Sequence, residues 1–183
     1  MLSLPKFKNK MPRQLTTYLL LFVILLLAQV LICNNILLFG IAMPVIFIYL
    51  IIRLPMSMSV SAVLTIGFLY GAMVDIFSDT AGVNAISCTV LALLRKPVYK
   101  LFIGHDSDMA GLTPSISTLG FFTYIKYMLT LVVIYFVISY ILIYFSFLHL
   151  TDLLGRILSS AGITALLLIG IDCLIVDRSD KKI

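Results

Sequence analysis

The sequence contains no glutamate and no tryptophan, and it has only two histidines and three cysteines. Without glutamate it cannot form the His-Glu-x-x-His pattern of zinc proteases, and it also lacks a glycine-rich phosphate loop and a nucleophile elbow. The cysteines, Cys33, Cys88 and Cys173, lie far apart, so their spacing suggests neither a metal site nor a redox pair. The sequence therefore predicts no enzyme activity, no metal and no cofactor.

Charge is also scarce, since 11% of the 183 residues are charged while 62% are hydrophobic. A soluble domain of this size cannot bury so much apolar side chain. Long apolar runs recur along the chain, which indicates that its solvent is a lipid bilayer. We expect an all-α integral membrane protein, a single compact bundle over residues 15–176 with no soluble domain.

About six transmembrane helices are predicted, because each needs roughly 20 apolar residues. The first run follows a basic start and is too long for the apolar part of a signal peptide, so it is interpreted as a retained span. A cytoplasmic loop is predicted at 95–120, between the fourth and fifth helices. A basic cytoplasmic segment at 1–14 precedes the helices, and a cytoplasmic tail at 177–183 follows them. The predicted spans are 15–32, 36–52, 58–76, 82–94, 121–147 and 157–176.

The basic residues predict the orientation, because lysine and arginine favour the cytoplasmic side of short loops. Six spans place both termini on one side, and that side then carries all the basic residues outside the spans except Arg156. Both termini are accordingly expected in the cytoplasm. The net charge of +5 favours contact with anionic lipids over binding of nucleic acid. The inner-leaflet basic residues named as candidates are Arg53, Arg95, Lys96 and Lys100.

Gly67, Gly71 and Asp75 are spaced four apart and share one face of the third predicted helix. Small residues at this spacing allow close helix approach in lipid, so Gly67 and Gly71, together with Gly82, are candidates for helix packing or a partner interface. A carboxylate in this position is expected to face protein or water. We expect Asp75 to hydrogen-bond the start of the fourth helix, with a binding or proton site as the alternative.

Two further aspartates are expected to have structural roles. Asp79, with Thr80 and Asn84, is a candidate cap for the start of the fourth helix. Asp172 lies near the cytoplasmic end of the sixth span, where Arg53, Arg95 or the terminal basic residues are its expected partners. Because Asp75 is expected near the opposite membrane face, the two carboxylates are not expected to form a catalytic pair.

In the central region, Gly71 and Asp75 stand at the end of one span, Arg53-Leu54-Pro55 comes before it, and Gly82 is followed by a helix that ends at Leu94-Arg95-Lys96-Pro97. In these features the chain resembles the rod-shape-determining MreD family. The resemblance implies a non-enzymatic scaffold in a bacterial inner membrane, which associates with the membrane-anchored protein MreC and other cell-elongation proteins. Such a scaffold links the actin-like cytoskeleton to peptidoglycan synthesis. The resemblance also implies the fold of the substrate-binding subunits of energy-coupling-factor transporters.

That shared fold gives an alternative function, a solute-binding subunit of an energy-coupling-factor importer. Such subunits typically carry an Ala-x-x-x-Ala surface on their first helix, whereas the first run here contains one alanine, which argues against this alternative. A third hypothesis, a lipid-modifying enzyme, has no supporting motif. The partner surface stays open between the face with Gly67 and Gly71 and a second face with Gly155, Ser159 and Gly162.

Overall fold

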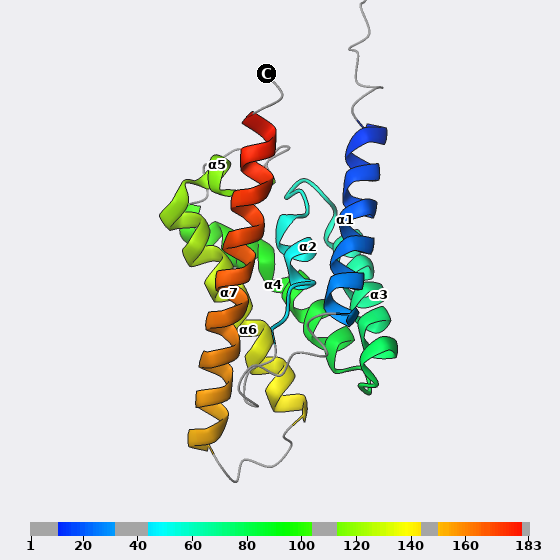
Figure 1. Ribbon diagram of the computed structural model, residues 1–183, viewed down its shortest axis with the longest axis vertical. Coiled ribbons are helices and arrows are strands. Elements are labelled where there is room, and N and C mark those ends of the chain that lie inside the picture. Colours follow the sequence, from blue (N-terminus) through cyan, green and yellow to red (C-terminus); the bar gives the residue numbers. More distant parts are fainter. Residues whose placement is uncertain (1–10, 32–43, 104–112, 144–149, 181–183) are drawn as a thin grey trace, which may run out of the picture.

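The computed structural model describes residues 11–31, 44–103, 113–143 and 150–180, and these ranges contain helices and no strand. Between residues 44 and 59 and between 113 and 120 the chain forms only short helices joined by turns. Figure 1 shows the elements, which are α1 (Met11–Leu31), α2 (Ile48–Arg53), α3 (Val60–Ser78), α4 (Val83–Ile103), α5 (Ile116–Leu119), α6 (Phe121–Ile143) and α7 (Leu150–Asp180).

Three helical segments are long and apolar enough to cross a membrane: Val60–Ser78, Phe121–Ile143 and Leu154–Cys173. Much of their apolar surface faces outward, for example at Phe68, Ile76 and Leu166. Apolar side chains on the outside of a helix suit contact with lipid. The described residues thus form a helical membrane protein, and the count of six spans stays a prediction.

The helices run back and forth between two ends of the molecule. Figure 1 shows the start of α1 and the end of α7 at the same end, the upper one, with the α3–α4 turn toward the other end. α3 packs along α4, α4 along α6, and α6 along α7, in the order of the chain. The two ends of the described chain therefore lie at the same end of the molecule.

The predicted ends of several spans change. α3 begins and ends two residues later than predicted, and α7 is longer than its predicted span at both ends. The parts of the predicted flanking segments at 11–14 and 177–180 are helical, within α1 and α7. Residues 1–10, 144–147 and 181–183 of the predictions lie outside the described residues.

α4 is 21 residues long and continues well past Leu94, so the predicted start of the cytoplasmic loop at residue 95 is wrong. The helix extends to Ile103 with Pro97 inside it, and α5 lies within the rest of the predicted loop. Proline removes one helix hydrogen bond, but neighbouring helices offset this loss in membrane bundles. Here Tyr99, beyond the proline, is fully buried and packs on Tyr127 of α6, which holds the last turns of α4 in place.

The second predicted span, 36–52, is not a continuous helix. Its described part begins at Pro44, and residues 44–47 are not helical, while α2 has six residues and is too short to cross a bilayer. The residues at 36–43 lie outside the described part of the chain. Proline at 44 donates no backbone hydrogen bond, which favours a break at this point.

Side chains from distant helices satisfy the backbone of this break. Gln29 Nε2 donates to the Pro44 carbonyl at 3.2 Å, and its Oε1 accepts from the Ile46 N–H at 2.9 Å. The Val45 N–H donates to Thr164 Oγ1 of α7 at 3.1 Å. Non-helical backbone in a membrane protein needs such partners, because lipid supplies none. The segment 44–47 and α2 are buried, and α2 lies between α1 and α7 in Figure 1.

Candidate functional site

Asp75 lies at the end of α3 with its side chain 5% exposed and accepts hydrogen bonds from the start of α4. Its Oδ2 accepts from the Ala85 N–H at 2.8 Å, and its Oδ1 accepts from the Asn84 N–H at 3.0 Å. The Asn84 side-chain amide, at 3.0 Å, and the Thr80 hydroxyl also donate to Oδ1. The first backbone N–H groups of a helix have no partner within it, so Asp75 caps α4 from the neighbouring helix.

The corner between α3 and α4 depends on two residues with positive φ. α3 ends at Asp79, which has φ 53° and ψ 41°, and its N–H donates to the Asp75 carbonyl. Gly82 has φ +80°, a conformation that glycine adopts without strain, and a Cβ there would meet no atom within 4 Å. Gly82 is therefore a turn residue. Of its two predicted roles, packing against a helix of the chain is wrong, and a partner interface stays a prediction.

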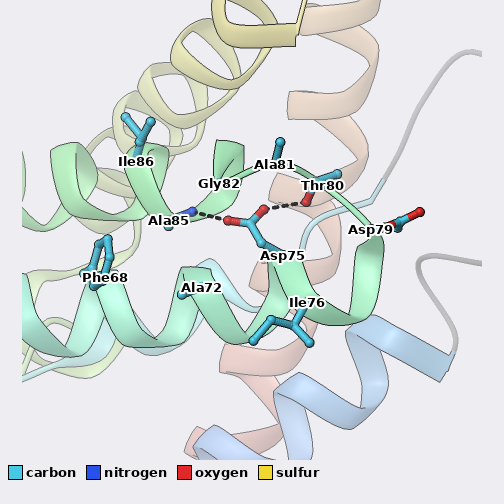
Figure 2. Close-up of a pocket in the computed structure, with 10 residues that line it drawn as sticks. All are labelled: Phe68, Ala72, Asp75, Ile76, Asp79, Thr80, Ala81, Gly82, Ala85 and Ile86. Atoms are coloured by element: carbon cyan, nitrogen blue, oxygen red, sulfur yellow. Dashed lines mark hydrogen bonds between the residues drawn. The ribbon is translucent and has the colours of Figure 1, made fainter.

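The side chain of Asp79 does not cap α4, in contrast to its predicted role. It is exposed and points away from the carboxylate of Asp75 in Figure 2. Asp79 instead ends α3 through its backbone, in the left-handed conformation that aspartate and asparagine tolerate better than most residues. Of the candidate caps, Asn84 and Thr80 do join the corner, and Tyr135 of α6 donates its hydroxyl hydrogen to Asn84 Oδ1.

A hollow of about 660 Å³ lies beside this corner on the outside of α3 and α4. Figure 2 shows Asp75 and Thr80 in its wall together with the apolar side chains of Phe68, Ile76 and Ile86. The Asp75 oxygens are occupied by the four hydrogen bonds described above. The geometry favours the structural interpretation of Asp75 over a binding or proton site.

The glycine face of α3 packs against α4 within the chain. A Cβ at Gly71 would lie 2.5 Å from the Asn84 carbonyl oxygen, and one at Gly67 would lie 3.0 Å from the Cys88 carbonyl oxygen. These distances leave no room for a larger side chain between the two backbones. Gly67 and Gly71 are consequently helix-packing residues, and their face is not open to a partner.

Asp172 of α7 is fully buried and forms an ion pair with Arg53, one of its three expected partners. The Tyr49 hydroxyl donates to Asp172 Oδ1 at 2.6 Å, and the Ile116 N–H donates to Oδ2 at 3.2 Å. One carboxylate therefore connects α7 to α2 and to the start of α5. A buried ion pair of this kind is a structural connection whose loss is costly.

Arg95, predicted as an inner-leaflet basic residue, is fully buried inside the bundle. Its Nη1 donates to the Ile51 carbonyl at 2.9 Å, and its Nη2 donates to the Pro55 carbonyl at 2.7 Å. These carbonyls lie at and just beyond the end of α2, where a cation is favoured by the helix dipole. The positive-inside rule concerns the side of the membrane and does not distinguish a surface cation from a buried one.

The other candidate basic residues differ in exposure. Lys96 is partly buried, and its Nζ donates to the Met58 carbonyl at 2.7 Å, whereas Lys100 is exposed. The Arg53 side chain is 17% exposed beside its partner Asp172. Of the four, Lys100 has the exposure expected of a residue in contact with lipid headgroups or cytoplasmic groups.

The outer face of α7 is open. Cβ atoms placed on Gly155, Gly162 and Gly170 would meet no atom within 4 Å, and Leu158 and Leu166 on this face are 67% and 72% exposed. Small residues between exposed leucines leave a shallow strip along the helix. In lipid, such a strip allows another helix to approach closely.

Sequence reasoning missed Gln29 and Thr164, which satisfy the break before α2, and Tyr49, which joins the Asp172 cluster. A glutamine inside an apolar run was an available signal, because an amide in lipid needs a partner. Within the residues that the structure describes, no three histidine, cysteine or acidic side chains lie together as metal ligands would.

Comparison of the chain with protein-family models, curated proteins and solved structures found no significant match.

Proposed function

We propose that the chain is a non-enzymatic scaffold of the bacterial cell-elongation machinery, as its resemblance to the MreD family implies. In this role it binds an MreC-like membrane-anchored protein and helps connect the actin-like cytoskeleton to peptidoglycan synthesis. The observation that carries the proposal is the contrast between two glycine faces. Gly67 and Gly71 are enclosed by α4, whereas Gly155, Gly162 and Gly170 of α7 meet no atom within 4 Å.

The chemistry of the open face indicates the kind of partner. Only a helix or a closed barrel satisfies its own backbone in lipid, and small residues along one helix face suit the close approach of a second helix. Its exposed side chains, such as Leu158 and Leu166, are apolar. The occupant that we propose is the single transmembrane helix of the MreC-like protein.

The buried carboxylates support a role without chemistry. Asp75 caps α4, and Asp172 pairs with Arg53 and accepts two further hydrogen bonds. Each carboxylate accepts hydrogen bonds that hold helices together, which supports a structural role for both.

The orientation is part of the proposal: both termini in the cytoplasm of a bacterial inner membrane. In a background without native cysteines, a cysteine at position 156 is expected to react with an impermeant thiol reagent added outside the cell, and one at position 100 is not. Both positions lie in described helices at opposite ends of the bundle. Labelling at position 100 alone would reverse the orientation.

Complementation of cell shape tests the proposal. In cells depleted of the native protein, Gly162→Leu is expected to give rounded cells at normal protein level, because a branched side chain blocks helix approach. The matched control is Ile141→Leu, at an exposed position of α6. It is expected to preserve rods. If the wild-type chain does not affect cell shape, the proposed function is wrong; if Gly162→Leu preserves rods, only the α7 surface is wrong.

A further inference from the structure

Three hydrogen-bond donors are buried near the ends of α4 and α6 without an acceptor among the described residues. They are Arg95 Nε and the hydroxyls of Tyr99 and Tyr127. All three side chains are 0% exposed. The fourth such atom, the Tyr124 hydroxyl, lies beside Arg53 and belongs to the Asp172 cluster.

The three side chains lie close together. Arg95 and Tyr99 are one turn apart on α4, so they share a face. Tyr127 of α6 places its ring against Tyr99, with centroids 5.8 Å apart and ring planes at 88°. The three side chains therefore come from two helices that pack against each other.

The charge of Arg95 has no carboxylate partner within the described residues, where Arg53 and Asp172 form the one salt bridge. Two of its nitrogens donate to neutral carbonyls, so among the described residues the positive charge has no counterion. Buried polar groups nearly always have partners, and a buried charge needs a counter-charge more than a neutral group does. A water molecule would accept from some of these donors but would leave the charge uncompensated.

The position of the cluster fits a ligand at the membrane surface. Tyr99 is four residues from the end of α4 and Tyr127 is six residues from the start of α6, which puts them roughly 6 to 9 Å from those helix ends. The next basic residues on α4, Lys96 and Lys100, keep the surrounding potential positive. Anionic lipid headgroups concentrate next to basic residues near a membrane surface.

We propose that Arg95, Tyr99 and Tyr127 form a binding site for a phosphate group, supplied by an acidic phospholipid or by free phosphate. Phosphate oxygens accept several hydrogen bonds and carry the negative charge that the site lacks, and guanidinium groups bind them well. Lys100, exposed near the end of α4, adds attraction for the same anion. This site does not depend on the proposed scaffold function.

Thermal unfolding of the purified full chain in mild detergent tests the site. The added compounds are a short-chain phosphatidylglycerol, a phosphatidylcholine of the same chain length, sodium phosphate, and sodium chloride at matched ionic strength. The variants are Tyr99→Phe and Tyr127→Phe. The matched control is Tyr70→Phe, because the Tyr70 hydroxyl is paired, donating to the Phe22 carbonyl at 3.3 Å.

Phosphatidylglycerol or phosphate is expected to raise the Tm of the wild-type chain, and phosphatidylcholine and chloride are not. Tyr99→Phe and Tyr127→Phe should melt like the wild type without the anion, since the lost hydroxyl had no partner. They should bind the anion about tenfold more weakly, the loss of one charge-assisted hydrogen bond. Tyr70→Phe should melt lower than the wild type and keep the full anion response.

The two sources give different results. If phosphatidylglycerol alone raises the Tm, the ligand is a lipid headgroup. If sodium phosphate raises the Tm as well, the free ion is sufficient. Tightly bound phosphate would show as phosphorus retained by the lipid-depleted wild type and reduced in Tyr127→Phe, which also supports the site. The proposal is overturned if no anion raises the Tm and the protein holds no phosphorus, or if both tyrosine variants bind the anion with wild-type affinity.

Discussion

Replacing Asp75 by leucine tests the corner between α3 and α4 most sharply. The substitution removes the acceptor of two backbone donors, the N–H groups of Asn84 and Ala85, and of two side-chain donors. Ala85 is 5% exposed, so water does not replace the lost partner of its N–H group. An unsatisfied buried donor costs about 1–3 kcal/mol in the free energy of unfolding, so the Ala85 N–H alone gives a loss of about that size. The half-buried Asn84 N–H and the two side-chain donors add to this loss.

Asparagine at the same position should have an intermediate effect. Its amide oxygen can replace Oδ1, which accepts from Thr80 and from both nitrogens of Asn84. Its amide NH₂ group then faces the Ala85 N–H, where Oδ2 stood, and a donor cannot accept from a donor. One buried N–H is left unpaired, and the expected loss is about 1–3 kcal/mol.

Unfolding in mixed micelles, as the fraction of denaturing detergent is raised, gives the free energies of unfolding for this series. The matched control is Asp79→Asn, four residues further on, where the side chain is exposed and forms no hydrogen bond within the described residues. Its cost should stay within about 0.5 kcal/mol. The reasoning is refuted if Asp75→Leu is as stable as the wild type, or if Asp79→Asn costs as much. If Asp75→Asn is stable yet inactive in cells, the charge itself has a function.

Three further predictions concern other contacts. Asp172→Leu should cost about 3–5 kcal/mol because it leaves Arg53 buried without its partner, and Arg53→Met should recover much of this loss in a double-mutant cycle; independent, additive losses would contradict the ion pair. Gly71→Ala should lower the Tm because its Cβ would lie 2.5 Å from the Asn84 carbonyl oxygen, whereas Gly162→Ala should not, since its Cβ meets open space; equal Tm values would contradict the packing. Thr164→Val keeps the shape but removes the acceptor of the Val45 N–H and should cost about 1–3 kcal/mol in unfolding free energy, so an unchanged value would refute this role.

The α3–α4 corner could be predicted because its determinants are close in sequence. The spacing of Gly67, Gly71 and Asp75 follows from the helical repeat, and the turn residues before Gly82 mark the chain reversal. The kind of contact that each glycine makes was harder to predict. A glycine required for positive φ and one required for close packing look alike in sequence, so the sequence does not distinguish Gly82 from Gly67 and Gly71.

The break before α2 could not be predicted from hydropathy. Residues 44–47 are as apolar as a spanning helix, and their backbone is satisfied by Gln29 and Thr164, the second of which lies 119 residues from Val45. At Pro97 the sequence predicts a helix end that the structure does not have. Proline is typical of a helix end, yet α4 continues past it because Tyr99 is buried against α6.

Hydropathy also could not predict whether a basic residue is buried or exposed. Arg95 and Lys100 stand on the same helix near the same end, and hydropathy treats them alike. The difference arises from the chain after α2, whose carbonyls at Ile51 and Pro55 turn toward Arg95 and hold it inside the bundle. Lys100 has no such partner within the described residues and is exposed.

Affinity purification of the tagged chain in mild detergent, with identification of the proteins that accompany it, tests the scaffold function most directly. The account predicts an MreC-like membrane-anchored protein among them at near-stoichiometric amount, retained by Ile141→Leu and lost with Gly162→Leu. Recovery of a membrane coupling subunit with its ATPases in place of an MreC-like protein would contradict the scaffold and favour the importer subunit.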